Sequence, residues 1–395
     1  MNILIADKMS ENAVEALRKL GATVRVEPAL GADDLPNAIA DTDILIVRST
    51  KVSSATIDAG SALSLIIRAG AGVNTIDVSY ASSRGIHVAN CPGKNSDAVA
   101  ELAIGLIVAA DRRIAFQAED LRAGIWDKKN YGKASGLKGR TLGIIGYGSI
   151  GKGVAKRAKA FGMPVMAWSR SLTPERAEED GIIYCATPQE LARQADVLSL
   201  HLAVTKETEN LVNREFLNLM KNSAILVNTS RGEIIDQDAL MEAIDSKGLK
   251  VALDVYNGEP GAGDDSFSLI DLAKKVTGTH HVGASTDQAA EAIAAETVRI
   301  VKTYIETGKP ANQVNAQEKS PAPFGLVVRH FNRVGVLAGI LDALREADVN
   351  VEEMENAIFA GGKAAVCTLK LDQKPKSETV SSIRDDSNVI QVSFA

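Results

Sequence analysis

This chain contains little cysteine, and it lacks both a long hydrophobic run and a block of basic residues. The three cysteines, Cys91, Cys185 and Cys367, are too few and too widely spaced for a disulfide framework, so they predict reduced thiols in the cytoplasm. The longest apolar run, residues 102–110, falls short of the roughly 18 residues that a membrane span needs. The net charge is -6, and without a basic stripe neither nucleic acid nor a membrane is expected as a partner.

Short apolar segments alternate with amphipathic segments through most of the 395 residues. This alternation predicts parallel sheets with helices on both faces, and the length is enough for two or three domains. The expected strands form two series, residues 3–6, 23–26, 44–47, 66–69 and 87–89, then 142–145, 164–168, 197–200, 224–228 and 251–254. One long helical stretch over residues 96–123 separates the series, and a helix over residues 286–307 follows the second.

The pattern changes after residues 310–323, a polar stretch with three prolines that predicts a linker. Beyond it, the expected elements are strand 324–329, helix 336–346, strands 349–357 and 364–371, helix 377–383 and strand 389–394. This βαββαβ order predicts a compact α+β module. The expected fold class is therefore α/β, with two doubly wound Rossmann-like parallel-sheet domains followed by this module.

The most specific local motif lies in residues 141–151. Gly146, Gly148 and Gly151 stand in G-x-G-x-x-G register between an apolar strand and a helix. The glycines permit a tight turn and close approach to a pyrophosphate, and the amides that open the helix favour phosphate groups. A nicotinamide dinucleotide is therefore the expected cofactor, and Ser149 and Ile150 are expected to contact it.

The end of the next strand leaves the choice between NAD and NADP open. The acid that would bind the adenosine ribose is missing there, and the sequence reads Trp168-Ser169-Arg170-Ser171. Ser169 and Arg170 suit the 2′-phosphate of NADP. Alternatively, Arg170 stacks on the adenine or points to solvent while NAD binds.

Three further segments follow the glycine motif in order. They are Asn228-Thr-Ser-Arg-Gly-Glu-Ile-Ile-Asp236, Ala252-Leu-Asp-Val-Tyr-Asn-Gly-Glu-Pro260 and Thr279-His-His-Val-Gly-Ala-Ser-Thr286. With the glycine motif, they resemble the D-isomer-specific 2-hydroxyacid dehydrogenases over about residues 1–315. The resemblance implies a catalytic set of Arg231, Glu259 and His281, and cofactor contacts from Thr229, Asp254 and His201. His201 could equally be a capping residue. His280 stands where the family usually has proline, and the spacing to Gly283 favours its neighbour as the catalytic histidine.

These residue types suit the oxidation of a 2-hydroxy acid. Histidine can accept the hydroxyl proton near neutral pH. A carboxylate beside the imidazole raises its pKa and fixes its orientation, which fits the role implied for Glu259. Arginine can hold the substrate carboxylate through two parallel hydrogen bonds. No metal is expected.

The first domain offers residues for the substrate, because the loops after residues 47 and 68 end successive strands, where α/β sheets place ligands. The resemblance implies that the backbone around Ala71 and Gly72 binds the substrate carboxylate and that Asn95 lies at the hinge. Isolated cationic side chains are more often solvated than bound. The candidates for a phosphate on the substrate are nevertheless Arg48, Ser49 and Lys128.

The C-terminal module resembles an ACT regulatory domain in residues 327–337 and 348–356, although Val334 replaces the usual proline. Such modules pair edge to edge and bind small amino acids. The resemblance implies that His330, Asn332 and Asn350 hold L-serine, unless the tail only dimerises. Family members with such a tail oxidise 3-phosphoglycerate in the first step of serine synthesis, so 3-phosphoglycerate is the expected substrate.

We expect a discontinuous substrate domain, residues 1–97 and 284–315, around a cofactor domain of residues 98–283, with the regulatory module in residues 322–395. A homodimer or homotetramer is expected. One rival is a glyoxylate or hydroxypyruvate reductase that uses NADPH, favoured by Ser169 and Arg170. A remote rival is a non-catalytic NAD-sensing corepressor, which the intact catalytic set does not exclude.

Overall fold

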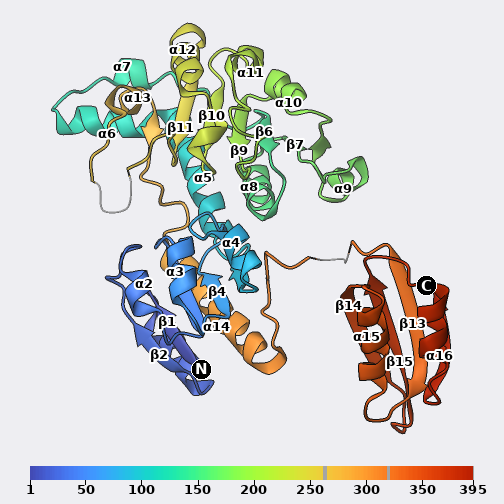
Figure 1. Ribbon diagram of the computed structural model, residues 1–395. Coiled ribbons are helices and arrows are strands. Elements are labelled where there is room, and N and C mark those ends of the chain that lie inside the picture. The colour runs from blue at the N-terminus through green and yellow to red at the C-terminus, as the bar shows by residue number, and fades with distance from the viewer. Residues whose placement is uncertain (261–264, 318–320, 395) are drawn as a thin grey trace. The chain divides into compact units, whose positions relative to one another are not determined.

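The computed structural model describes residues 1–260, 265–317 and 321–394, which divide into two compact units, Met1–Asn315 and Ala316–Ala395. Part of the expected linker, residues 318–320, lies outside the described residues. The first unit contains two parallel sheets and the second unit an antiparallel sheet (Figure 1). The expected fold class is confirmed. Among the described residues, no helix has the length and apolar character to cross a membrane.

The first sheet has the strand order β2-β1-β3-β4-β5, the flavodoxin-like arrangement. Its strands are β1 (Asn2–Ile5), β2 (Thr23–Val26), β3 (Ile44–Val47), β4 (Leu65–Arg68) and β5 (His87–Asn90). The helices associated with it are α1 (Glu11–Lys19), α2 (Leu35–Ala38), α3 (Ser54–Ala59), α4 (Val78–Ser83) and α14 (Asp287–Thr307). Ile293 and Ile300 of α14 share a buried core with Ile3 and Ile46, so the chain returns to this sheet late in the sequence.

The second sheet has the order β12-β11-β10-β9-β6-β7-β8, which contains the Rossmann arrangement. Its strands are β6 (Leu142–Ile145), β7 (Val165–Trp168), β8 (Ile183–Tyr184), β9 (Val197–Leu200), β10 (Ile225–Asn228), β11 (Lys250–Leu253) and β12 (Thr277–Gly278). The helices of this part are α5 (Ser96–Arg112), α6 (Ile114–Arg122), α7 (Lys128–Tyr131), α8 (Ser149–Ala160), α9 (Pro174–Glu179), α10 (Pro188–Gln194), α11 (Arg214–Leu219), the 3-10 helix η1 (Gly232–Ile234), α12 (Gln237–Lys247) and α13 (Ile270–Ala273). Two buried cores, one on each face, hold this sheet between its helices.

We expected one long helical stretch over residues 96–123, and its continuity is wrong, because the structure has two helices there, α5 and α6. They meet at Arg113, whose φ of 53° is left-handed and cannot continue a right-handed helix. The Arg113 guanidinium lies over the Tyr131 ring, 4.8 Å from its centroid. That tertiary contact comes from α7, so helical periodicity alone did not reveal the break.

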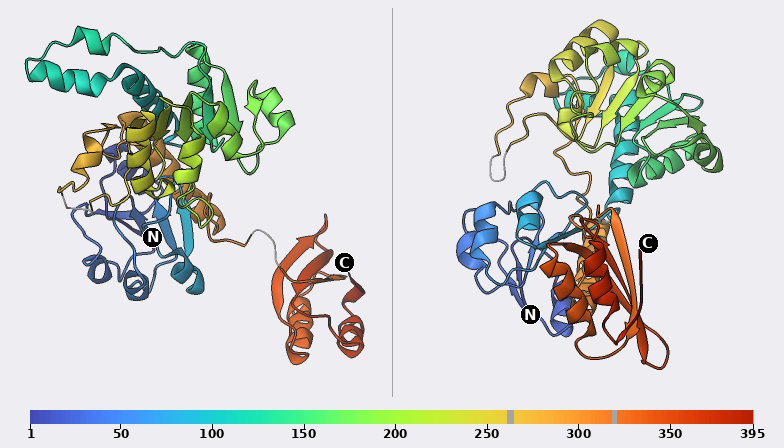
Figure 2. Two further views of the ribbon diagram at one scale, coloured as in Figure 1. Left: turned by 90° about the horizontal axis from the view of Figure 1, so that it is seen from above. Right: turned by 45° about the vertical axis from the view of Figure 1, so that its right-hand side comes forward.

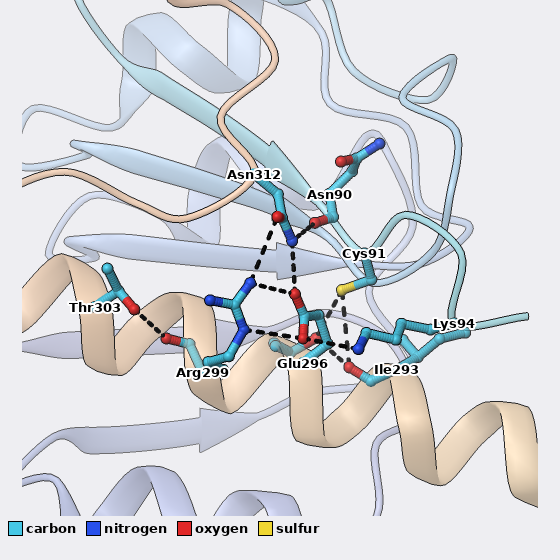
Figure 3. Close-up of polar contacts among 9 residues, drawn as sticks. Asn90, Cys91, Lys94, Ile293, Glu296, Arg299, Thr303 and Asn312 are labelled. Atoms are coloured by element: carbon cyan, nitrogen blue, oxygen red, sulfur yellow. Dashed lines mark hydrogen bonds and ion pairs between the residues drawn. The ribbon is translucent and has the colours of Figure 1, made fainter. Parts of the chain in front are cut away.

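An ionic network on α14 ties together segments that are distant in the sequence (Figure 3). The Glu296 carboxylate lies 3.2 Å from the Nζ of Lys94, which precedes α5, and it accepts hydrogen bonds from Arg299. Asn312 donates to Glu296 and to the backbone carbonyl of Asn90 at the end of β5. The start of α5 is thereby anchored to α14, at the point where the chain leaves the first sheet.

The second unit has the strand order β14-β15-β13-β16. Its elements are β13 (Phe324–Phe331), α15 (Val336–Glu346), β14 (Val351–Ile358), β15 (Ala364–Leu371), α16 (Ser377–Arg384) and β16 (Val389–Phe394), in the expected βαββαβ order. Both helices lie on one face of the sheet (Figure 2). Their apolar side chains form one core with side chains of the strands. The outer strands β14 and β16 are edges, which leaves their outer backbone groups unpaired within this unit.

Candidate active site

The turn between β6 and α8 requires its glycines. Gly146 has a φ of 98°, and a Cβ there would lie 2.1 Å from the carbonyl oxygen of His201. A Cβ on Gly151 would lie 2.3 Å from the Gly146 carbonyl oxygen. At Gly148, the N-cap of α8, a Cβ would meet nothing within 4 Å, so this position opens to space outside the protein backbone. The turn therefore presents the amides of Ser149 and its neighbours to an anion.

Buried polar atoms without a partner lie close to this turn. His201 Nδ1 and Thr229 Oγ1, which follow β9 and β10, are buried and make no hydrogen bond. His201 Nε2 bonds Ser199 Oγ at 2.8 Å, and desolvation lowers the pKa of His201 to about 4, so the ring is neutral at physiological pH. Such atoms cost free energy until a ligand satisfies them. With the glycine turn, they fit a dinucleotide at the carboxyl edge of this sheet.

The residues expected to discriminate NAD from NADP follow β7. Arg170 is exposed and Ser169 is half-buried, directly after the strand ends at Trp168. The Arg170 charge is among the causes that lower the pKa of Glu207, after hydrogen bonds from Thr205 and the Glu207 amide, so this carboxylate from the loop after β9 lies in the same region. No acid occurs within the β7 segment itself, as the sequence indicated.

His281 and Glu259 form the pair that the resemblance implied. Glu259 Oε2 lies 2.7 Å from His281 Nδ1, and Glu259 Oε1 accepts a hydrogen bond from the Tyr256 backbone amide at 2.8 Å. The Glu259 bond raises the pKa of His281 despite partial burial. Burial alone would raise the pKa of Glu259, but the bonds from His281 and Tyr256 lower it below its usual value. Within the described residues, His281 Nε2 makes no hydrogen bond, so it remains available to a substrate.

Asp254 holds the loop that carries the histidine. This buried carboxylate accepts hydrogen bonds from Thr279 Oγ1 at 2.7 Å and from the backbone amides of Val282 and Gly283 at 2.8 and 2.9 Å. The amide of His281 donates to the Asp254 carbonyl oxygen, and the φ of His281 is 52°. A left-handed histidine is uncommon and needs such surrounding bonds to persist.

Arg231 is positioned by Asn228, a residue that the sequence analysis did not single out. The Asn228 side chain accepts from the amide and hydroxyl of Ser230 and donates to the Arg231 carbonyl oxygen at 2.7 Å. Gly232 packs directly on the loop after β11, because a Cβ on Gly232 would lie 2.1 Å from the Tyr256 carbonyl carbon. The loops of Arg231 and Glu259 are thus in contact. The signal available in the sequence was an asparagine that ends an apolar strand.

The Arg231 guanidinium extends to the loop after β4 in the first sheet. A Cβ on Gly72 would lie 3.4 Å from Arg231 Nη2, and the adjacent Ala71 carbonyl accepts a hydrogen bond from Asn90. Arg68, also not singled out, has its pKa lowered by burial and by the nearby charges of Arg231 and Arg48. Three guanidinium groups therefore gather where the two parallel sheets meet, an arrangement suited to an anionic substrate.

Arg48 and Ser49 lie in a loop fixed by Asp7. Asp7 Oδ2 accepts hydrogen bonds from the backbone amides of Arg48, Ser49 and Thr50 at 2.6, 3.1 and 3.2 Å. Asn95 immediately precedes α5, and its Oδ1 is buried without a partner. Lys128 instead lines a separate cavity of about 340 Å³ on the α6–α7 segment, beside the exposed Trp126. Within one chain, Lys128 is not brought to the Arg48 loop, and its role stays a prediction.

The three expected effector residues do not converge within one chain. His330 is buried, with Nε2 3.1 Å from Asn356 Oδ1, and Asn332 donates to the Gly362 carbonyl oxygen. Asn350 donates to Glu352 and precedes β14, whose Val351 pairs with Leu371. His330 pairs with Ala365 at the other end of β15. The length of β15 separates the two positions by about 20 Å.

The described geometry agrees with what this chain resembles among known proteins. Residues 104–283 match the family model for the NAD binding domain of D-isomer specific 2-hydroxyacid dehydrogenases. The chain is 37% identical to the D-3-phosphoglycerate dehydrogenase of Methanocaldococcus jannaschii over 91% of this chain and 68% of the relative. It is 39% identical to a hydroxypyruvate reductase of Thermotoga maritima over 77% of this chain and 97% of the relative. The NAD+-bound 3-phosphoglycerate dehydrogenase of Entamoeba histolytica superposes with a TM-score of 0.67 and 29% identity, covering 80% of this chain and 99% of that one.

Proposed function

Because this chain belongs to the D-isomer-specific 2-hydroxyacid dehydrogenase family, whose members use NAD, we propose that it is a D-3-phosphoglycerate dehydrogenase. In this reaction, 3-phosphoglycerate is oxidised at C2 to 3-phosphohydroxypyruvate, the first step of L-serine synthesis. The observation that carries the proposal is the bond of 2.7 Å between Glu259 and His281, with Arg231 on the adjoining loop.

His281 acts as the general base that accepts the C2 hydroxyl proton, while Glu259 stabilises the imidazolium that results. Arg231 holds the substrate carboxylate against the backbone of residues 71–72 and polarises the C2 oxygen. When bound, NAD supplies the hydride acceptor. The neutral His201, Thr229, Asp254 and the amides that open α8 are proposed to hold it, and the residues between the two parallel sheets are proposed to exclude water from the transfer.

The choice of substrate rests on two features. The Arg48 loop offers a cation and several hydroxyl groups near Arg68 and Arg231, which suits a phosphorylated acid. The C-terminal unit has the βαββαβ order of an amino-acid sensor, and a serine sensor belongs on the first step of serine synthesis.

One alternative is favoured by a specific observation. The β7 segment ends without an acid and with Arg170, as an NADP-dependent reductase would require, and the Thermotoga maritima relative is a hydroxypyruvate reductase. A reductase of hydroxypyruvate or glyoxylate that uses NADPH would retain the same catalytic set. It would have no need for cations at the Arg48 loop.

L-serine is the proposed effector, and assembly of the protein into a dimer or tetramer is proposed with it. Within one chain, Asn350 lies at one end of β14, and His330 and Asn332 lie near its other end. If two modules pair antiparallel along β14, Asn350 of the partner subunit comes toward His330 and Asn332. A second contact is supported by an apolar surface on the α6–α7 segment, made of the exposed side chains Ile114, Leu121, Ile125 and Trp126.

Initial rates test the proposal directly. Oxidation of 3-phosphoglycerate is measured with NAD and with NADP, beside D-glycerate as the unphosphorylated control. Activity confined to the phosphorylated acid supports the proposed function. Rapid reduction of hydroxypyruvate or glyoxylate, without turnover of the phosphorylated pair, favours the reductase. Binding of the cofactor without turnover of any 2-hydroxy acid would instead favour a sensor.

A further inference from the structure

Two cationic side chains face the same pair of cavities at the carboxyl edge of the first sheet. Lys8 follows β1 and Arg48 follows β3, and both line cavities of about 570 and 370 Å³. Within the described residues, neither side chain has an acidic oxygen within 4 Å. By contrast, Lys250, Lys274 and Lys275, which line another cavity, each lie within 4 Å of one. Two unpaired cations beside a solvent-filled space make a potential anion site.

Asp7 determines how these two cations are held. Its Oδ2 accepts hydrogen bonds from three successive amides of the Arg48 loop, and the Arg48 carbonyl oxygen accepts a further bond of 3.0 Å from Arg68 Nε. The loop backbone is therefore fixed, while the Arg48 guanidinium has no acidic partner in the described part of the chain. Lys8 is the next residue after Asp7, so the same clamp keeps its backbone beside the loop.

The larger cavity is lined in part by residues that follow His281 closely in the sequence. Its wall includes Ser49 and also Ser285 and Thr286, which lie four and five residues after His281 and lead into α14. These hydroxyl groups can donate to phosphate oxygens. The acids on these walls are Asp7 and Asp287, with Glu291 beside the smaller cavity. Asp7 is engaged with the amides of the Arg48 loop, and Asp287 lies in the first turn of a 21-residue helix, where a carboxylate stabilises the helix itself.

We propose that Lys8, together with Arg48, binds the phosphate group of the substrate and makes the enzyme specific for phosphorylated 2-hydroxy acids. This inference rests on the proposed function and adds a residue to it. The substrate carboxylate occupies one end of the site, between Arg231 and the loop of residues 70–72. The phosphate lies at the other end, where its two negative charges need more than one cation.

The test compares two substrates that differ only in the phosphate group. Reduction of 3-phosphohydroxypyruvate and of hydroxypyruvate is measured for the wild type, Lys8→Met and Lys8→Arg. Lys51→Met is the matched control, because Lys51 is an exposed lysine on the same loop that lines neither cavity. Loss of one charge-assisted contact should raise KM for the phosphorylated substrate about tenfold or more. The kcat/KM for hydroxypyruvate should stay within about twofold, Lys8→Arg should recover most of the affinity, and Lys51→Met should behave as the wild type.

The outcomes separate the two claims. A wild type that does not prefer the phosphorylated substrate overturns the proposed function and this inference with it. A wild type that prefers it, with a preference that is unchanged in Lys8→Met, overturns the inference alone. Equal losses on both substrates in Lys8→Met, or the same loss in Lys51→Met, would also overturn it, because they would report a structural or general electrostatic effect.

Discussion

Individual residues of the site are held by bonds that leave their reactive atoms free. Glu259 is oriented by the Tyr256 amide and bonds one ring nitrogen of His281, while the other nitrogen stays available. Asp254 uses both of its oxygens to hold the loop that carries the histidine. The site therefore contains residues that orient other side chains, in addition to those proposed to contact the substrate.

Replacing Glu259 by glutamine should shift the pH dependence of the reaction. Oxidation needs neutral His281, and Glu259 raises the pKa of that histidine, so the rate of the wild type rises with pH through a raised pKa. A neutral amide in place of the carboxylate cannot stabilise the imidazolium, so the rising limb should move to lower pH, and kcat should fall about 10- to 100-fold. The pH profile of kcat/KM measures this, with the exposed Glu242→Gln as control. An unshifted limb would mean that another group titrates.

Replacing Arg170 by aspartate should shift cofactor preference toward NAD by about tenfold or more. A carboxylate after β7 can accept hydrogen bonds from the ribose hydroxyls and repels a 2′-phosphate. The ratio of kcat/KM for NAD to that for NADP measures the change, and Arg193→Asp on the exposed face of α10 is the control. If the ratio does not change, Arg170 does not contact the ribose region.

Elements, rather than single residues, determine where the glycine turn and the crossing between the two parallel sheets lie. In the β6–α8 turn, a Cβ on Gly146 or Gly151 would collide with backbone atoms, whereas a Cβ on Gly148 would point into open space. Helix α14 belongs to the first sheet by its core, although it follows the whole second sheet in the sequence. Its Glu296 network reaches the residues from which α5 begins.

Substitutions in the glycine turn should separate folding from cofactor binding. Gly146→Ala should destabilise the protein, because its Cβ would lie 2.1 Å from the His201 carbonyl oxygen at a left-handed φ. Gly148→Ala should leave the stability nearly unchanged, since the Cβ meets no protein atom within 4 Å, but it should weaken NAD binding about tenfold. Thermal unfolding and calorimetric titration with NAD measure the two effects. Equal effects of both substitutions on stability would contradict this account.

Replacing Glu296 by glutamine should remove stability that depends on pH. The bonds from Arg299, Asn312 and Lys94 outweigh the effect of burial and lower the pKa of Glu296 to about 2. A carboxyl with a lowered pKa stabilises the fold above its unfolded value near 4.5, and this contribution disappears as the pH falls toward 2. Urea unfolding should therefore show a loss of roughly 2 kcal/mol at pH 7 and a clearly smaller loss at pH 2.5, where most of this contribution has disappeared. Glu306→Gln on the exposed end of α14 serves as the control, and a loss that is equal at both pH values would refute the argument.

The whole molecule consists of two units with separate cores. No residue of the buried core around Leu326 and Cys367 is shared with the cores of the two parallel sheets. The catalytic candidates all lie in the first unit and the effector candidates in the second. Removal of the second unit should therefore leave the catalytic candidates in place.

Truncation after Asn315 should retain turnover and abolish the response to serine. The remaining chain keeps both parallel sheets and the Glu259–His281 pair, so kcat should stay within about threefold of the full chain. Titration of the initial rate with L-serine measures the response. The full chain with His330→Ala is the comparison, because it should lose inhibition without losing the module. Inhibition that survives truncation would place the effector site in the first unit.

The sequence by itself determined the features that depend on local pattern. Apolar runs and their spacing predicted almost every strand, because hydrophobic periodicity is a local property of the sequence. The spacing of Gly146, Gly148 and Gly151 predicted the β6–α8 turn, because the need for glycine in such a turn is also local. The resemblance implied that Glu259 and His281 are partners, and in the structure the two side chains form a hydrogen bond.

Only the tertiary structure decided which distant residues meet. The break at Arg113 accompanies a contact with Tyr131 of α7, and Arg68 approaches Arg231 from the other parallel sheet. The clamp of Asp7 on the Arg48 loop and the opposite ends taken by His330 and Asn350 follow from strand order and register. Sequence spacing does not reveal these contacts, because strands that are neighbours in a sheet can be separated by a whole domain in the chain. Lys8 carries no signal in the sequence, and the first sheet brings it to a cavity that Arg48 also lines.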